Sequence, residues 1–263
     1  MKFFQTVNLA SLLATSQTQA SPISNIPAKQ QQTQPKSQNT QYSNNWSGIV
    51  QNQSPSQDDV YTHVSAAITI PDVSLNGLES YQAASIWVGI DGASDSKAIL
   101  QTGVEVGILD GSPRYAAWHQ WFPEASKQLA DFELHAGDVV VATVESTSSS
   151  SGTCVLENKS TGQTVTKTVK APNPTATITG QNTEWIVEDF LSGDAPVPLV
   201  DFSEVKFEGC QASGKKGGKV GVADSTPFHM VDGKKTVTTV DVVDDSRFVV
   251  KHGSELTQVF RST

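Results

Sequence analysis

The segment Thr183–Phe190 carries the side chains best suited to move protons. It reads TEWIVEDF and holds three carboxyl groups among apolar residues. Because side chains alternate along a strand, Glu184 and Glu188 would share one face and Trp185 the other. A carboxyl group in a concavity loses hydration, which raises its pKa toward values useful to a general acid or base. Alternation alone favours the simpler outcome, a solvent-exposed face.

Amides and aromatic rings recur in two other apolar segments. The run Tyr115–Phe122 puts Trp118 and Gln120 on one side of a strand, a pattern found both in ligand grooves and in filled cores. Gln101 is a lone amide within Ala98–Val104, where a buried amide must find hydrogen-bond partners. These residues alone leave sugar binding, glycoside hydrolysis and peptide hydrolysis open.

Signals for other chemistries are missing from the sequence. The histidines lack the i, i+4 pair or Cys-x-x-Cys partner of a metal site, so we expect no metal. The glycine-rich run Gly214–Gly221 lacks the strand and helix that flank a phosphate loop, so we expect no cofactor. A nucleophile elbow at Ser112 is excluded because Asp110 and Arg114 replace its glycines.

Short β-rich runs, separated by Gly, Pro, Asp and Ser clusters, must position these residues. Many such runs are typical of an antiparallel sandwich or barrel, and no amphipathic helix is evident. The expected strands are His63–Ile70, Ala84–Ile90, Ala98–Ile108, Tyr115–Phe122, Asp131–His135, Val139–Glu145, Thr153–Glu157, Thr164–Val169, Glu184–Phe190, Val197–Phe207, Lys235–Val243 and Phe248–Lys251.

The N-terminus indicates export. Residues 1–20 combine one early lysine, a short apolar run and small residues at the end, which is typical of a secretory signal peptide. Residues 21–41 hold almost no large apolar side chains and are expected to be a disordered propeptide. Residues 42–263 then form one domain of the secreted, extracellular protein.

Charge and cysteine count narrow the partners and the compartment. The chain has 18 basic and 27 acidic residues, and its first 40 residues hold three lysines and no acids. The acidic body argues against nucleic acids and anionic membranes as partners, and a monomer is expected. Two cysteines in an oxidising compartment suggest one disulfide, Cys154–Cys210.

An ordered set of motifs goes beyond these generic patterns. The set comprises Ser43–Gly48 (SNNWSG), Trp87–Gly92 (WVGIDG), Ala98–Val104 (AILQTGV) and Glu184–Phe190 (EWIVEDF). Together they closely resemble the glutamic peptidases, or eqolisins, of filamentous fungi. The resemblance runs from about residue 42 to the C-terminus and is weaker after residue 209.

The resemblance implies a fold, a catalytic pair and a substrate site. The fold would be an all-β sandwich of two antiparallel sheets with a concave substrate groove. The catalytic pair would be Gln101 and Glu188. Trp46, Trp87, Asp91, Trp118 and Gln120 would line the groove, with Asp91 near the pair and tuning its hydrogen bonds.

The chemistry of an amide and a carboxylate suits hydrolysis of polypeptides at acid pH. Glu188 as carboxylate can take a proton from water, acting as a general base. The side-chain N–H₂ of Gln101 can donate to the oxyanion that forms on the attacked carbonyl. Neither a covalent intermediate nor a metal is required for this reaction.

Two departures from the family pattern concern the segment Tyr115–Pro123. Relatives commonly read Y-D-A-W-Y-E-W-Y-P, so Ala116 replaces an Asp and Gln120 replaces a Glu. Fewer carboxylates near Glu188 would raise its pKa less by like-charge repulsion. The acid limb of the pH–rate profile would then lie lower than in relatives.

Two rival functions remain at this stage. One is an inactive sandwich module that binds peptide or glycan, which the presence of both Gln101 and Glu188 disfavours. The other is a glycoside hydrolase that uses Glu184 and Glu188. These two residues lie about 13–14 Å apart along a strand, beyond the roughly 5–9.5 Å between the carboxyl groups of glycosidases.

Overall fold

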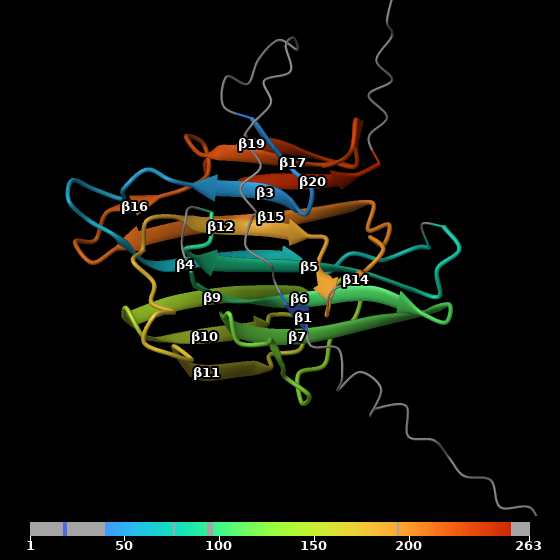
Figure 1. Ribbon diagram of the computed structural model, residues 1–263, viewed down its shortest axis with the longest axis horizontal. Coiled ribbons are helices and arrows are strands. Elements are labelled where there is room, and N and C mark those ends of the chain that lie inside the picture. The colour runs from blue at the N-terminus through green and yellow to red at the C-terminus, as the bar shows by residue number, and fades with distance from the viewer. Residues whose placement is uncertain (1–17, 20–39, 76, 94–96, 194, 254–263) are drawn as a thin grey trace, which may run out of the picture.

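The computed structural model describes residues 18–19, 40–75, 77–93, 97–193 and 195–253 (Figure 1). Within these ranges all regular secondary structure is β-strand, which confirms the all-β prediction. The expected signal peptide and propeptide fall outside the described residues, except for residues 18–19 and 40–41. No helix in the described part of the chain is long and apolar enough to cross a membrane.

A nine-stranded sheet carries all the expected catalytic residues. Its strands run in the order β18 (Lys235–Thr236), β17 (Thr226–Asp232), β3 (Trp46–Gln51), β12 (Thr183–Glu188), β5 (Tyr81–Ile90), β6 (Ile99–Leu109), β7 (Ser112–Phe122) and β8 (Lys127–Gln128), with β2 (Gln41–Ser43) beside β17. All these strand pairs are antiparallel except β2 with β17, which is parallel.

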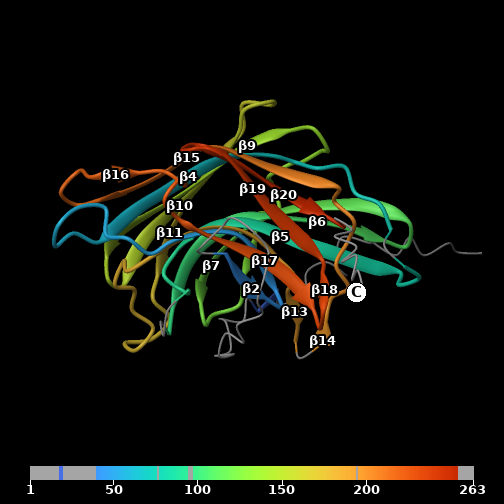
Figure 2. The same ribbon diagram turned by 90° about the horizontal axis from the view of Figure 1, so that it is seen from above.

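An eight-stranded sheet packs against the first, and both sheets are curved (Figure 2). Its order is β11 (Thr164–Lys170), β10 (Ser151–Asn158), β9 (Val139–Ser148), β4 (Tyr61–Thr69), β15 (Glu204–Gly214), β20 (Arg247–His252) and β19 (Thr238–Asp244), with β16 (Lys219–Val220) beside β15. A third, small sheet joins β1 (Thr18–Gln19), β13 (Leu191–Ser192) and β14 (Ala195–Pro196). The arrangement confirms a two-sheet sandwich.

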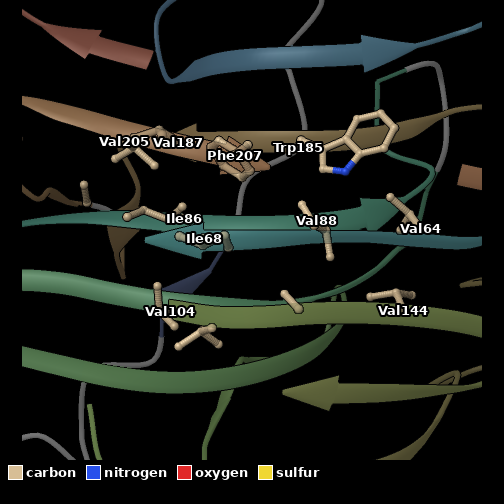
Figure 3. Close-up of a cluster of buried hydrophobic side chains, with 14 of the residues drawn as sticks. Val64, Ile68, Ile86, Val88, Val104, Val144, Trp185, Val187, Val205 and Phe207 are labelled. Carbon is tan, nitrogen blue, oxygen red and sulfur yellow. The ribbon is translucent and has the colours of Figure 1, made fainter. Parts of the chain in front are cut away.

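The main core fills the space between the two large sheets (Figure 3). Trp185 and Val187 of β12 point into this core, where they pack with Ile68 of β4 and Val144 of β9. Burying such apolar surface stabilises the fold by roughly 25 cal/mol per Å². Because side chains alternate, the even-numbered residues of β12 must point to the opposite face of the sheet.

Several expected strand boundaries were wrong. Residues 131–135 form turns and extended chain without a ladder, and residues 197–203 make only isolated bridges before β15 begins at Glu204. Strands β3 and β17 were missed. In β3, Ser47, Gly48 and Gln51 interrupt the apolar residues, and β17 contains Pro227, which disfavours a strand.

The predicted disulfide is wrong: Cys154 and Cys210 are both free and buried. Cys154 lies on β10 and Cys210 on β15, and two strands of the same sheet, β9 and β4, run between them. Three strand spacings amount to about 14 Å, whereas bridged cysteines need Cα atoms within about 7 Å. A count of cysteines carries no information on this separation.

Reducing agent is therefore expected to leave the melting temperature unchanged. A bridge closing this loop would contribute about 4 kcal/mol, so its reduction would lower the melting temperature by roughly 10 °C. The check is a thermal scan with and without dithiothreitol. Alkylation of the denatured, unreduced protein should label both thiols. A lower melting temperature in dithiothreitol, together with unlabelled cysteines, would show that the Cys154–Cys210 disulfide does form.

Candidate active site

A second apolar cluster lies on the face of the nine-stranded sheet that points away from the main core. Its members are Trp46, Val50, Trp87, Ile99, Trp118, Ile186 and Phe228. Ile186 belongs to it, so the neighbouring even-numbered residues Glu184 and Glu188 point to this face as well. Ile99 places Gln101 there by the same argument. The face thus combines aromatic rings, an amide and two carboxyl groups.

The register of the ladder arranges these side chains in rows across the strands. Glu188 pairs with Trp46 on β3 and with Ser85 on β5. Gln101 pairs with Gly89 on β5 and with Gln120 on β7. The two rows lie four residues apart along β5, which corresponds to about 13–14 Å.

The row between them carries Trp87 on β5 and Trp118 on β7, both paired with Gly103 of β6. A Cβ atom on Gly89 would lie 2.9 Å from Cζ3 of Trp87 and 3.3 Å from Cβ of Gln101. The missing side chain at Gly89 therefore leaves space for the indole beside Gln101. The opposite edge of the same ring reaches Glu188, so Trp87 spans the interval between the two expected catalytic residues.

Donors from three residues surround the Glu188 carboxyl group. Nε1 of Trp87 donates to Oε2 at 2.9 Å, and Nδ2 of Asn45 donates to Oε1 at 3.4 Å. Nε1 of Trp46 makes no hydrogen bond within the described part of the chain, yet its N–H lies near enough to favour the charged carboxylate of Glu188. Asn45 was not among the expected site residues, although it directly precedes Trp46 in the SNNWSG motif.

Burial raises the pKa of Glu188 to about 8, and the neighbouring Asp189 adds to the rise. The N–H groups of Trp46, Trp87 and Asn45 oppose it. Glu188 is 1% exposed and Gln101 is fully buried, so the site is closed to solvent in this form. In this closed form Glu188 is protonated across the acid range.

Gln101 is held by another amide. Its Nε2 donates to Oε1 of Gln120 at 2.6 Å, while its own Oε1 is buried without a partner among the described residues. Gln120 in turn donates from Nε2 to the backbone carbonyl of Glu124 at 2.7 Å. No hydrogen bond within the described structure joins Gln101 to Glu188, so a reacting group would have to lie between them.

Among the described residues, Asp91 makes no hydrogen bond to Gln101 or Glu188. Its carboxyl group accepts the backbone N–H groups of Thr179, of Gly180 at 2.9 Å and of Gln181 at 2.8 Å. These bonds tie the end of β5 to the loop that leads into β12, the strand of Glu188. Asp91 thus positions a strand instead of tuning the hydrogen bonds of Gln101 or Glu188.

Further carboxyl groups on or beside this face were not expected to be buried so deeply. Glu184 is fully buried and neither oxygen makes a hydrogen bond among the described residues. Burial, and then the charge of Asp91, raises the pKa of Glu184 well above its usual value, opposed by the backbone N–H of Ala93. Burial raises the pKa of Glu105, opposed by the Tyr81 hydroxyl that donates to it at 2.9 Å.

Possible metal ligands do not gather in the described residues. No group of three or more His, Cys, Asp or Glu side chains there is arranged to hold a metal ion. The site instead brings together Gln101, Glu188, Trp46, Trp87, Trp118 and Gln120 of the expected residues, with Asn45 added and Asp91 set to one side.

Comparison with known proteins gives a consistent result. The Peptidase A4 family profile matches residues 44–252. Aspergillopepsin-2 of Aspergillus niger is 38% identical over 225 residues, covering 79% of this chain and 77% of its own. A crystal structure of scytalido-glutamic peptidase with a transition state analog inhibitor superposes with a TM-score of 0.70 at 31% identity, covering 80% of this chain and 98% of its own.

A second solved structure extends the comparison to peptides. It is described as SCP-B, a member of the eqolisin family, in a complex with the tripeptide Ala-Ile-His. It matches with a TM-score of 0.66 and 31% identity, over 80% of this chain and 98% of its own.

The β-sandwich and its relatives define a glutamic-type endopeptidase. The chain belongs to the Peptidase A4 family. The two rival functions, an inactive binding module and a glycoside hydrolase, lose their support with this assignment.

Proposed function

We propose that this endopeptidase is secreted and hydrolyses peptide bonds at acid pH, with Glu188 as general base and Gln101 as oxyanion donor. The observation that supports the pair best is the Trp87 indole. It donates to Glu188 at 2.9 Å, and Cζ3 on its other edge borders the space at Gly89 that Cβ of Gln101 also borders. A peptide that lies along this ring would pass both side chains.

The reaction would proceed without a covalent intermediate. Glu188 removes a proton from water, which attacks the carbonyl carbon, and Nε2 of Gln101 donates to the oxygen as it becomes negative. Glu188 then returns the proton to the leaving nitrogen, and the C–N bond breaks. No cofactor takes part in these steps.

A general base must be ionised, so the closed form described above would be inactive at acid pH. Because burial is the first cause of the raised pKa of Glu188, entry of water would lower that pKa. The three N–H groups around the carboxyl would then favour the carboxylate. Opening of the site is thus expected to convert Glu188 into a base.

The propeptide, residues 21–41, is proposed to keep the site closed before maturation. Its last residue, Gln41, begins β2, which pairs with β17 in the sheet that carries Glu188. Cleavage of the propeptide would open the site when the protein reaches an acid milieu. The mature protein would act on polypeptides as a monomer, with neither nucleic acid nor membrane as a partner.

Acidification of the purified precursor tests this function. The wild type is expected to lose its leader and to digest denatured protein, insensitive to pepstatin and to chelators. The Glu188→Gln variant should do neither, because an amide cannot accept the proton from water. Equal proteolysis by this variant would refute the assignment of Glu188.

A further inference from the structure

Gln120 holds a fixed place between a backbone carbonyl and the amide of Gln101. Gln120 is 2% exposed and Gln101 is fully buried, so no solvent competes for these bonds. The two side chains face each other because their residues pair across β6 and β7. Nε2 of Gln101 donates to Oε1 of Gln120 at 2.6 Å, and Nε2 of Gln120 donates to the backbone carbonyl oxygen of Glu124 at 2.7 Å.

The chemistry of the three groups permits one orientation. The carbonyl of Glu124 can only accept, so Gln120 must turn its N–H₂ toward it. Oε1 of Gln120 then faces Gln101 and can only accept as well, so Gln101 must present its own N–H₂. Flipping either amide would set two oxygens or two N–H₂ groups against each other in a buried site, where an unpaired polar group is destabilising.

We infer that Gln120 is a positioning residue. The Glu124 carbonyl fixes the orientation of the Gln120 amide, and the Gln120 amide in turn fixes the orientation of the Gln101 amide. One N–H of Gln101 binds Gln120, and the second N–H remains for the oxyanion. This inference rests on the proposed function, since it presumes that Gln101 is the oxyanion donor. Because every group in this chain of hydrogen bonds is uncharged, the orientation of Gln101 does not change with pH.

A carboxyl group in place of the Gln120 amide would add an ionisable group to this chain of hydrogen bonds. In Gln120→Glu, one oxygen would take the place of Nε2 beside the Glu124 carbonyl. It must therefore carry a proton, while the other oxygen accepts from Gln101. Loss of that proton would set a carboxylate against the carbonyl and disturb both amides.

The test compares kcat and KM over a pH range for Gln120→Glu and Gln120→Met. Gln120→Met, which keeps the side-chain length, should lose about 10- to 100-fold in kcat with little change in KM. This is less than the loss of about 10²–10³ on removal of an oxyanion donor. Gln120→Glu should keep more activity than Gln120→Met in acid and lose it as pH rises, with an ionisation that the wild type lacks.

Gln51 provides a matched control. It is a buried amide of the same sheet, 3% exposed, and it donates to Oγ of Ser225 at 3.0 Å. Gln51→Glu and Gln51→Met should change the melting temperature without adding an ionisation to kcat. A wild-type kcat in Gln120→Met, or the same pH profile in Gln120→Glu as in the wild type, would overturn the inference. An inactive wild type would instead overturn the proposed function.

Discussion

Gln101→Ala is expected to lower kcat by about 10²–10³-fold, the usual cost of removing one oxyanion donor. KM should change little, because the donated hydrogen bond strengthens only as the carbonyl oxygen becomes negative. The Gln120 amide would remain in place through its bond to Glu124 at 2.7 Å. Steady-state kinetics on a peptide substrate, with the leader removed, measures both constants.

The control for this variant is Gln51→Ala, which removes a buried amide on β3 that pairs with Thr183, five residues along β12 from Glu188. Its kcat should stay close to that of the wild type. If Gln101→Ala lost as little kcat as Gln51→Ala, the oxyanion would be stabilised by donors other than Gln101. A rise in KM with constant kcat would assign Gln101 to substrate binding alone.

Glu184→Gln is expected to make the stability of the protein less sensitive to pH. The folded-state pKa of Glu184 is raised above its ordinary value of 4.5, because burial and the charge of Asp91 disfavour the carboxylate. Its contribution to stability is therefore full below about 4.5 and is lost as pH rises toward the raised pKa. The variant lacks this titration.

The measurement is the free energy of unfolding of both proteins from pH 4 to pH 8. The informative quantity is the change with pH of the difference between the two proteins, which should increasingly favour the variant as pH rises above about 4.5. Glu133→Gln, at an exposed position outside the strands, serves as the control, and an equal pH dependence in both variants would contradict the prediction.

The parts of the fold that the sequence predicts include strands with alternating burial and longer strands, such as β5 and β6, that are buried over almost their whole length. In β9 and β10 buried and less buried residues alternate regularly, and these strands were found. β3 spans only six residues, in which Ser47, Gly48 and Gln51 interrupt the apolar side chains, so the sequence shows neither an alternating pattern nor an apolar run. Pairing between distant strands, which decides where Cys154 and Cys210 lie, leaves no trace in local patterns.

The site was predictable only in part for a related reason. Alternation put Glu188 and Ile186 on one face, but it could not tell a wet face from a buried one. The motif resemblance supplied Gln101 and the tryptophans. The bonds of Asp91 to the loop before β12 depend on a contact across some ninety positions of sequence, and short segments do not encode such contacts.

The hydrogen bond from Trp87 to Glu188 has a consequence for how this protein can be studied. An indole whose N–H is bound to a carboxyl group senses the charge on that group, because the emitting state of tryptophan has a large dipole. Intrinsic fluorescence should thus report the protonation of Glu188 directly, in the absence of any substrate. The same ring that spans the site would serve as its optical probe.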